Sequence, residues 1–141
     1  MVPVWVYFAL GSAFFAGLTA IFGKIGVTGV NSNLATFLRT IVVLIFSGGI
    51  VLATGEWQNP AKLPGKTMIF LVLSALATGA SWLCYYRALQ LGPASQVAPV
   101  DKLGVVFAMV LAFIFLGEKA DIKTLSGGLL ILAGALVIAI K

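Results

Sequence analysis

Residues 67–86 read TMIFLVLSALATGASWLCYY, a run of twenty residues without a charge between Lys66 and Arg87. An α-helix rises about 1.5 Å per residue, so a helix of this length crosses the roughly 30 Å hydrocarbon core of a bilayer. A barrel strand would be only about 10 residues long and would alternate polar with apolar residues, which this run does not. The stretch therefore predicts a membrane-spanning α-helix.

Four more charge-free runs divide the rest of the chain. They are residues 1–23, 40–55, 103–117 and 124–140. We therefore predict an all-α membrane protein with five transmembrane helices. We place them at residues 3–23, 34–54, 67–89, 95–116 and 125–140, in a single domain that covers residues 1–141. Asn31, Ser32 and Asn33 are the candidate N-caps of the second helix, and Asp121 is the expected N-cap of the last.

The composition argues against the other classes of protein. Hydrophobic residues make up 61% of the chain and charged residues 9%, whereas soluble domains average about 45–50% and about 25%. A globule of this size has too little interior to hide so much apolar surface, and a disordered chain would contain far less of it. We expect the first run to be a retained helix rather than a signal peptide, because no basic residue precedes it.

The chain contains no histidine and a single cysteine, Cys84, and this limits its chemistry. Zinc sites of the HExxH type, Ser-His-Asp triads, intrachain disulfides and CxxC sites cannot be built from these residues. The net charge of +5 comes from scattered basic residues with no run of three, so no nucleic-acid partner is expected. We expect no metal site, no bound cofactor and no enzymatic activity.

Basic residues are distributed almost evenly between the two sides of the membrane. Five spans place Lys62, Lys66, Lys119 and Lys123 on the side of the N-terminus, and Lys24, Arg39, Arg87, Lys102 and Lys141 on the other. Orientation is normally set by an excess of Lys and Arg in cytoplasmic loops. Either weaker cues select one orientation, or the chain has dual topology, in which one gene produces both orientations. We favour dual topology.

Asp101 and Lys102 are the clearest candidates for function within a span. Charged side chains in the bilayer cost about 2.5–3.5 kcal/mol at mid-helix and commonly mark the paths of solutes or ions. Pro99 lacks an N–H and clashes with the carbonyl four residues earlier, so we expect the helix to bend there, as at the binding sites of transporters. The alternative is structural: Lys102 snorkels to the interface, and Asp101 pairs with Arg39 or Arg87.

Three more cations are expected on the same side of the membrane. They are Lys24 at the end of the first helix, Arg39 about one and a half turns into the second, and Arg87 near the end of the third. With Asp101 and Lys102 they would form a basic, partly buried cluster that favours an anionic or zwitterionic solute. Alternatively, the five charges are separate anchors at the interface.

The third helix carries a stripe of polar side chains. Ser74, Thr78, Ser81 and Tyr85 follow one another at spacings of four, three and four residues, which places them on one helix face. Such a stripe either lines a water-filled path or packs against another helix with its hydroxyls bonded to their own backbone. Trp82 lies beside the stripe, as a cavity wall or as a lipid-facing anchor.

Five short blocks of the sequence are characteristic of one family. They are YYRALQLGPAS at 85–95, APV at 98–100, FLGE at 115–118, FGKIG at 22–26 and FLR at 37–39. These blocks resemble the EamA domain of the drug/metabolite transporter superfamily, and the resemblance covers the whole chain as one copy. Most members carry two such five-helix copies in opposite orientations around a central substrate cavity. The resemblance therefore implies that this chain is one half of an inverted repeat.

These observations lead to one main functional hypothesis. We expect a secondary transporter or exporter of small metabolites in the cell membrane. The chain would pair with a second copy of itself, and the resulting homodimer would be antiparallel. Its site would include Lys24, Arg39, the four residues of the polar stripe, Pro99, Asp101 and Lys102, with proton or ion coupling through Asp101. The alternative is a membrane scaffold or accessory subunit whose charges only hold helices together.

Overall fold

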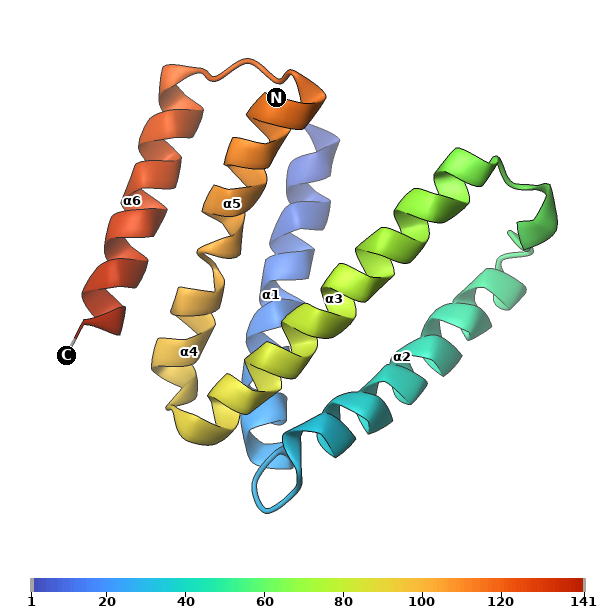
Figure 1. The fold of residues 1–141 in the computed structure, drawn as a ribbon, viewed down its shortest axis with the longest axis horizontal. Helices are drawn as coiled ribbons and strands as arrows, with labels where there is room; N and C mark the ends of the chain where they lie inside the picture. Colours follow the sequence, from blue (N-terminus) through green and yellow to red (C-terminus); the bar gives the residue numbers. More distant parts are fainter. Residues whose placement is uncertain (1, 141) are drawn as a thin grey trace. The chain divides into compact units, whose positions relative to one another are not determined.

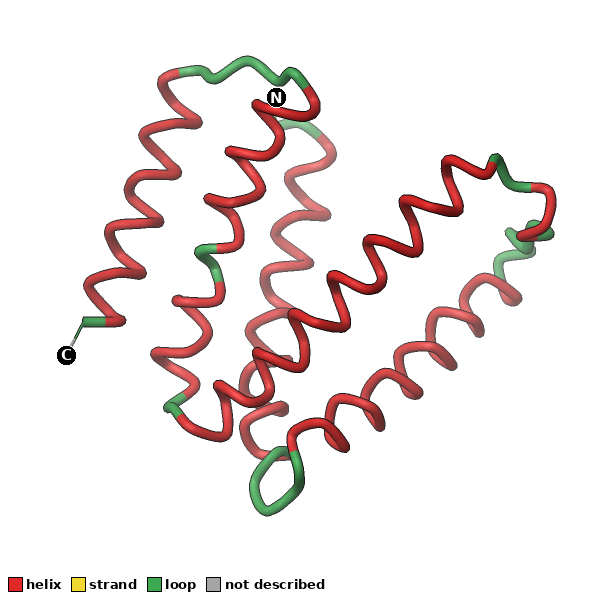
Figure 2. The backbone as a smooth tube through the Cα atoms, viewed as in Figure 1, coloured by secondary structure: helices red, strands yellow, loops and turns green. Residues whose placement is uncertain are grey.

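The computed structural model describes residues 2–140, which form helices joined by short connections and contain no strand (Figures 1 and 2). Five helices are long and apolar enough to cross a membrane. They are α1 (Val4–Gly26), α2 (Ser32–Ala53), α3 (Gly65–Leu91), the interrupted span Ala94–Leu116 and α6 (Ile122–Ala139). The predicted all-α class with five membrane-spanning helices is confirmed. Lys141, which entered the charge count, lies outside the described residues.

The helix ends show how short polar side chains begin these spans. The side chain of Asn31 accepts a hydrogen bond from the N–H of Asn33 at 2.9 Å, and that of Asp121 accepts from the N–H of Lys123 at 2.8 Å. Both residues are therefore N-caps: Asp121 as predicted, and Asn31 as one of the three candidates. The C-terminal ends of two other helices lie beyond their predicted limits. α1 continues three residues past residue 23, and α3 continues two residues past residue 89.

The contacts within the chain define two compact units, residues 23–91 and residues 1–22 together with 92–141. The first contains the end of α1, then α2, a 3-10 turn η1 (Pro60–Lys62) and α3. Within it, α2 and α3 run in opposite directions and pack against each other (Figure 1). This helix pair supports the candidate site described below.

The other unit contains most of α1, then α4 (Ala94–Asp101), α5 (Gly104–Leu111), a short π-helical turn η2 (Ala112–Leu116) and α6. Both α4 and α5 pack against α6. The approach of α5 to α6 is close, because a Cβ added at Gly128 would lie 2.7 Å from Cε of Met109. Glycine at this position lets the two helices meet.

The fourth span is interrupted at Lys102 and Leu103, between α4 and α5 (Figure 2). The N–H groups of these two residues bond only three residues back, to the carbonyls of Pro99 at 3.1 Å and Val100 at 3.0 Å. Pro99 contributes no N–H to the helical ladder and disfavours its regular geometry. Pro99 itself lies within α4, so the helix is not broken at the proline as predicted; it is interrupted three residues later, directly after Asp101.

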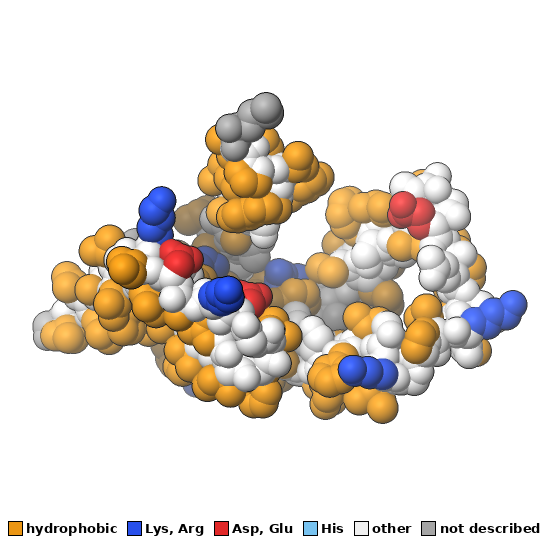
Figure 3. All heavy atoms as spheres, turned by 90° about the horizontal axis from the view of Figure 1, so that it is seen from above, with side chains coloured by type: hydrophobic (Ala, Val, Ile, Leu, Met, Phe, Trp, Pro, Cys, Tyr) orange, Lys and Arg blue, Asp and Glu red, His pale blue; other side chains and the backbone are white. Residues whose placement is uncertain are grey.

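Most apolar side chains of the described residues lie on the surface of the chain. The buried hydrophobic residues among them are few: Ala20, Val27, Tyr86, Leu89 and Ala135. Hydrophobic side chains cover most of the face seen in Figure 3, and the charged side chains are few. A surface of this kind suits a protein whose helices are covered by lipid or by other transmembrane helices.

Candidate functional site

A cavity of about 410 Å³ lies between α2 and α3. Its apolar walls are formed by residues of both helices, among them Val43, Leu44 and Leu71. Its polar lining also comes from both helices, and consists of Thr40, Ser47, Ser74, Thr78 and Trp82. The cavity is therefore mostly apolar with a few convergent polar groups, a composition typical of small-molecule sites.

Three of the four hydroxyl groups that line this cavity donate their protons to their own helices. Thr40 donates to the carbonyl of Thr36 at 2.8 Å, Ser47 to that of Val43 at 2.8 Å, and Thr78 to that of Ser74 at 2.9 Å. A hydroxyl carries one proton and two lone pairs. These three oxygens can therefore accept hydrogen bonds from a ligand, while their protons are already engaged.

Arg39 of α2 lies across two aromatic rings of α3. Its guanidinium carbon is 4.0 Å from the ring centroid of Trp82 and 5.5 Å from that of Tyr86, distances at which a cation is attracted to a ring face. Arg39 is half-buried, and its Nη1 atom is buried without a hydrogen-bond acceptor among the described residues. The charge of this arginine is thus held by ring faces rather than by a carboxylate of the same unit.

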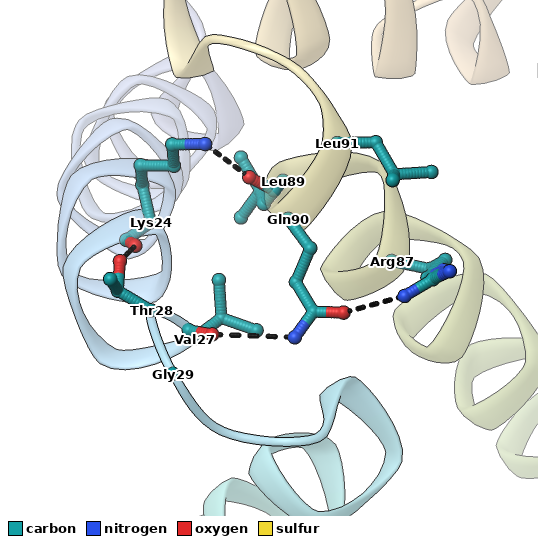
Figure 4. A pocket seen from close by; sticks show the side chains of 8 residues that line it. All are labelled: Lys24, Val27, Thr28, Gly29, Arg87, Leu89, Gln90 and Leu91. Atoms are coloured by element: carbon teal, nitrogen blue, oxygen red, sulfur yellow. Dashed lines mark hydrogen bonds between the residues drawn. The ribbon is translucent and has the colours of Figure 1, made fainter.

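A second pocket, of about 480 Å³, lies where α1 and α3 end (Figure 4). Lys24 donates to the carbonyl of Leu89, and the amide of Gln90 donates to the carbonyls of Val27 and Val30. Gln90 in turn accepts from Arg87 at 3.0 Å. These side chains satisfy carbonyls at the C-terminal ends of two helices, where positive groups are stabilising. The pocket is therefore bordered by residues that already cap helix ends.

Asp101 and Lys102 pair with each other at the interruption between α4 and α5. The distance from Nζ of Lys102 to Oδ2 of Asp101 is 3.5 Å. Both side chains remain partly exposed, Lys102 at 54% and Asp101 at 37%. At 3.5 Å this is one long contact between neighbouring residues, and it uses only one oxygen of the carboxylate. Both groups therefore remain available to a ligand.

The predicted site residues fall into separate groups in the structure. Ser74 and Thr78 line the α2–α3 cavity, but Ser81 and Tyr85 of the same stripe do not. Arg39 contacts the ring of Trp82, which lines the cavity, and Lys24 caps the end of α3. The predicted residues Pro99, Asp101 and Lys102 lie together at the helix interruption in the other unit.

Three contributions to these sites were not predicted from the sequence. They are the capping role of Gln90, the second ring provided by Tyr86, and the placement of Trp82 directly under Arg39. A glutamine just before Gly92-Pro93 was a usable signal for a helix end. No group of three His, Cys, Asp or Glu side chains suited to a metal ion occurs within residues 2–140.

Comparison with known proteins identifies the family. Residues 3–140 match the model of the EamA-like transporter family. The chain belongs to this family. The resemblance seen in the sequence blocks is thereby confirmed, and with five spanning helices the EamA chain is a multi-pass membrane protein. No solved structure matches it.

Three relatives place this EamA chain among both short and long proteins. It is 52% identical over 136 residues to a Sinorhizobium protein named uncharacterized transporter in cobO 3′ region, with 96% of each chain covered. It is 28% identical over 129 residues to an uncharacterized protein of Methanocaldococcus jannaschii, with 92% of this chain and 91% of that one covered. It is 31% identical over 134 residues to human solute carrier family 35 member G1, with 94% of this chain but 36% of the human protein covered.

Proposed function

We propose that this EamA protein is a secondary transporter of small metabolites in the cell membrane, and that it works as an antiparallel homodimer. The observation that carries the proposal is the α2–α3 cavity in a member of a transporter family, with acceptor hydroxyls on both walls and a cation beside it. A protein with this function has two kinds of partner besides its second copy: a small-molecule solute and membrane lipid. No bound cofactor is needed for such a mechanism.

A second copy of the chain is supported by the length of the relatives. The chain spans about a third of the human solute carrier but nearly all of the Sinorhizobium transporter. A longer protein has room for two copies of the domain in one chain, while a short one must obtain the other half from a partner. Alternating access around a shared path then requires the two halves to have opposite orientations.

The antiparallel arrangement can be tested with two variants of fixed orientation. One carries two extra lysines in the 54–64 loop and the other carries two in the 27–31 loop, which lies on the opposite side of the membrane. Each variant alone should insert in one direction and transport nothing. Co-expression of the two should restore transport in liposomes. Full activity of either variant alone would overturn the antiparallel dimer.

Transport itself is tested with the purified protein in liposomes. We expect saturable uptake of at least one small organic acid, amino acid or nucleobase, and a dependence on an imposed pH gradient if Asp101 carries a proton. Lys102→Ala should abolish uptake without loss of the dimer, while Lys119→Ala, in the loop before α6, serves as the matched control. Absence of any uptake would instead favour a scaffold or accessory subunit.

A further inference from the structure

Arg39 is a cation inside a span, and among the described residues of its own unit no acid pairs with it. It is the eighth residue of α2, about 10 Å from the start of the helix at about 1.5 Å per residue. Within the unit of residues 23–91 the sole acidic residue is Glu56, in the connection after α2, and its carboxylate accepts from the hydroxyl of Thr54. An uncompensated charge at this depth is costly and points to a ligand or a conformational role.

The two aromatic rings fix the direction of the guanidinium. Tyr86 is only 6% exposed and Trp82 is half-buried, so packing against neighbouring residues restrains both rings beside Arg39. A planar guanidinium held over a ring presents its N–H donors at its edge, where they match the two oxygens of a carboxylate. The aromatic pair therefore orients Arg39 for anion recognition.

The cavity between α2 and α3 supplies the complementary half of a site. Trp82 contacts Arg39 and also lines this cavity, so one residue links the cation to the cavity. The hydroxyl oxygens of Thr40 and Thr78 have donated their protons to their helices and are left as acceptors. Beyond them, Val43, Leu44 and Leu71 form an apolar surface.

We infer that Arg39 binds the carboxylate of the transported solute, and that Trp82 positions the guanidinium for it. The hydroxyl oxygens of Thr40 and Thr78 accept hydrogen bonds from a donor on the neighbouring carbon, and the apolar wall receives an aliphatic chain. The solute class is therefore a small aliphatic acid with a hydroxyl or ammonium group next to its carboxylate. This inference rests on the proposed transport function and names the chemistry of its solute.

Trp82 provides a direct reporter of binding that does not depend on transport. The chain has three tryptophans, and Trp5 and Trp57 are exposed at 68% and 65%. Replacement of both by phenylalanine leaves Trp82 as the single fluorophore beside the site. The purified protein is titrated with four probes on one carbon skeleton: leucine, 2-hydroxy-4-methylpentanoate, 4-methylpentanoate and leucinol.

The probes separate the two halves of the site. Leucine and the hydroxy acid carry both groups and should change the Trp82 fluorescence at the lowest concentrations. The acid without a donor, and leucinol without a carboxylate, should each bind at least about tenfold more weakly, the factor expected when a charge-assisted hydrogen bond is lost. Equal responses to all four probes, or no response to any, would overturn the assignment.

Variants connect each contact to its residue. Arg39→Met should remove the advantage of leucine over leucinol, and Thr40→Val with Thr78→Val should remove the advantage of the hydroxy acid over 4-methylpentanoate. Lys66→Gln removes a positive charge at the start of α3, and Thr54→Val removes a hydroxyl that bonds to its own helix outside the cavity. Both should bind all probes as the parent protein does.

Two further variants keep the assignment testable if the Arg39→Met protein does not fold. Arg39→Lys keeps the charge but loses the planar donor pair, and Trp82→Phe, assayed by leucine uptake, should raise KM more than it lowers kcat. If leucine transport is unchanged in Arg39→Lys and Trp82→Phe, the site assignment fails while the proposed transporter stands.

If the probes bind as expected but no solute crosses the liposome membrane, the transport function fails while the binding site stands. If a carboxylate of the partner copy neutralises Arg39, none of the probes will compete for it, and the inference is wrong.

Discussion

Lys24, in the last turn of α1, donates a hydrogen bond to the carbonyl of Leu89, in the last turn of α3. Gln90 reaches back in the other direction, to the carbonyl of Val27 (Figure 4) and to that of Val30. Each helix thus caps the C-terminal end of the other. This exchange joins segments more than sixty residues apart in the sequence, so it also fixes where the two helices meet.

Lys24→Met removes one half of this exchange. We expect the protein in detergent to lose about 1–3 kcal/mol of stability, because the half-buried carbonyl of Leu89 loses its donor. The measurement is the midpoint of thermal unfolding. Lys62→Met, at an exposed lysine of η1, should leave the midpoint unchanged. If Lys24→Met abolishes transport at unchanged stability, Lys24 belongs to the solute path, as the sequence suggested.

Gly23→Leu tests the packing of the same corner. A Cβ added at Gly23 would lie 3.2 Å from Cδ1 of Leu89 and 3.4 Å from the hydroxyl oxygen of Tyr86, so a leucine there has no room. We expect a loss of about 1–3 kcal/mol, typical of overpacking. Gly26→Leu is the matched control, because nothing lies within 4 Å of a Cβ at that position. Equal midpoints for the two variants would contradict the close contact of α1 with α3.

The spans were predictable because charge-free runs and bilayer thickness together leave few alternatives. The ends of α1 and α3 were placed two to three residues early, because Lys24 and Arg87 were read as helix ends. Their side chains instead bond to residues in the last turns or just beyond them, so the helices continue past these charges. Sequence spacing alone does not show such a tertiary contact.

The candidate site was only partly predictable, for a similar physical reason. A cation inside a span identified Arg39, and helical spacing identified Ser74 and Thr78. The aromatic support of Arg39 comes from another helix, and Trp82 is placed under it by the packing of α2 against α3. The same packing decides which residues of the stripe line the cavity, and helical periodicity does not contain that information.

Because of Asp121, the stability of the start of α6 depends on pH. Its carboxylate accepts from the hydroxyl of Thr124 at 2.6 Å and from the N–H groups of Thr124 and Lys123, and these bonds lower the pKa of Asp121 below its ordinary 3.8. A lowered pKa in the folded state means that the carboxylate stabilises the fold above pH 3.8. That contribution disappears as the pH falls through the lowered value.

Asp121→Ala should therefore lower the unfolding midpoint at pH 7, and its difference from the parent protein should shrink as the pH falls below about 4. The measurement is a series of melting curves between pH 3 and pH 7, spanning the ordinary pKa of a carboxylate at about 3.9. Glu118→Ala removes an exposed carboxylate that begins the same connection but does not cap α6. A midpoint difference that stays constant over this series would contradict a charged cap.

Single cysteines test which face of α3 meets water. In a Cys84→Ser background, we expect cysteines at Ser74 and Thr78 to react with a water-soluble maleimide, since both line the α2–α3 cavity. Cysteines at Phe70 and Leu73 should be protected by lipid, although their side chains are 61% and 53% exposed on the chain itself. Uniform protection at all four positions would favour a dry packing face.

Dual topology predicts two populations of the chain with opposite orientations, so that the C-terminus lies in the cytoplasm in one population and outside in the other. A reporter active only in the cytoplasm and one active only outside, each fused after Lys141, should both give signal in bacterial cells. Gln58→Lys, in the connection after α2, should silence one reporter, and Thr28→Lys, after α1, should silence the other. A single active reporter that neither substitution affects would exclude dual topology.

The interruption at Lys102 and Leu103 has a mechanical consequence. An unbroken helix fixes the rotation of every residue about one axis, but the N–H groups of the two residues at the interruption bond only three residues back, and this releases α5 from the rotational register of α4. The phase of each half is then set by its own contacts with α6. α5 is held against α6 where Met109 meets Gly128, and α4 packs against α6 through its own contacts, so the angle at which it presents Asp101 is not dictated by the register of α5.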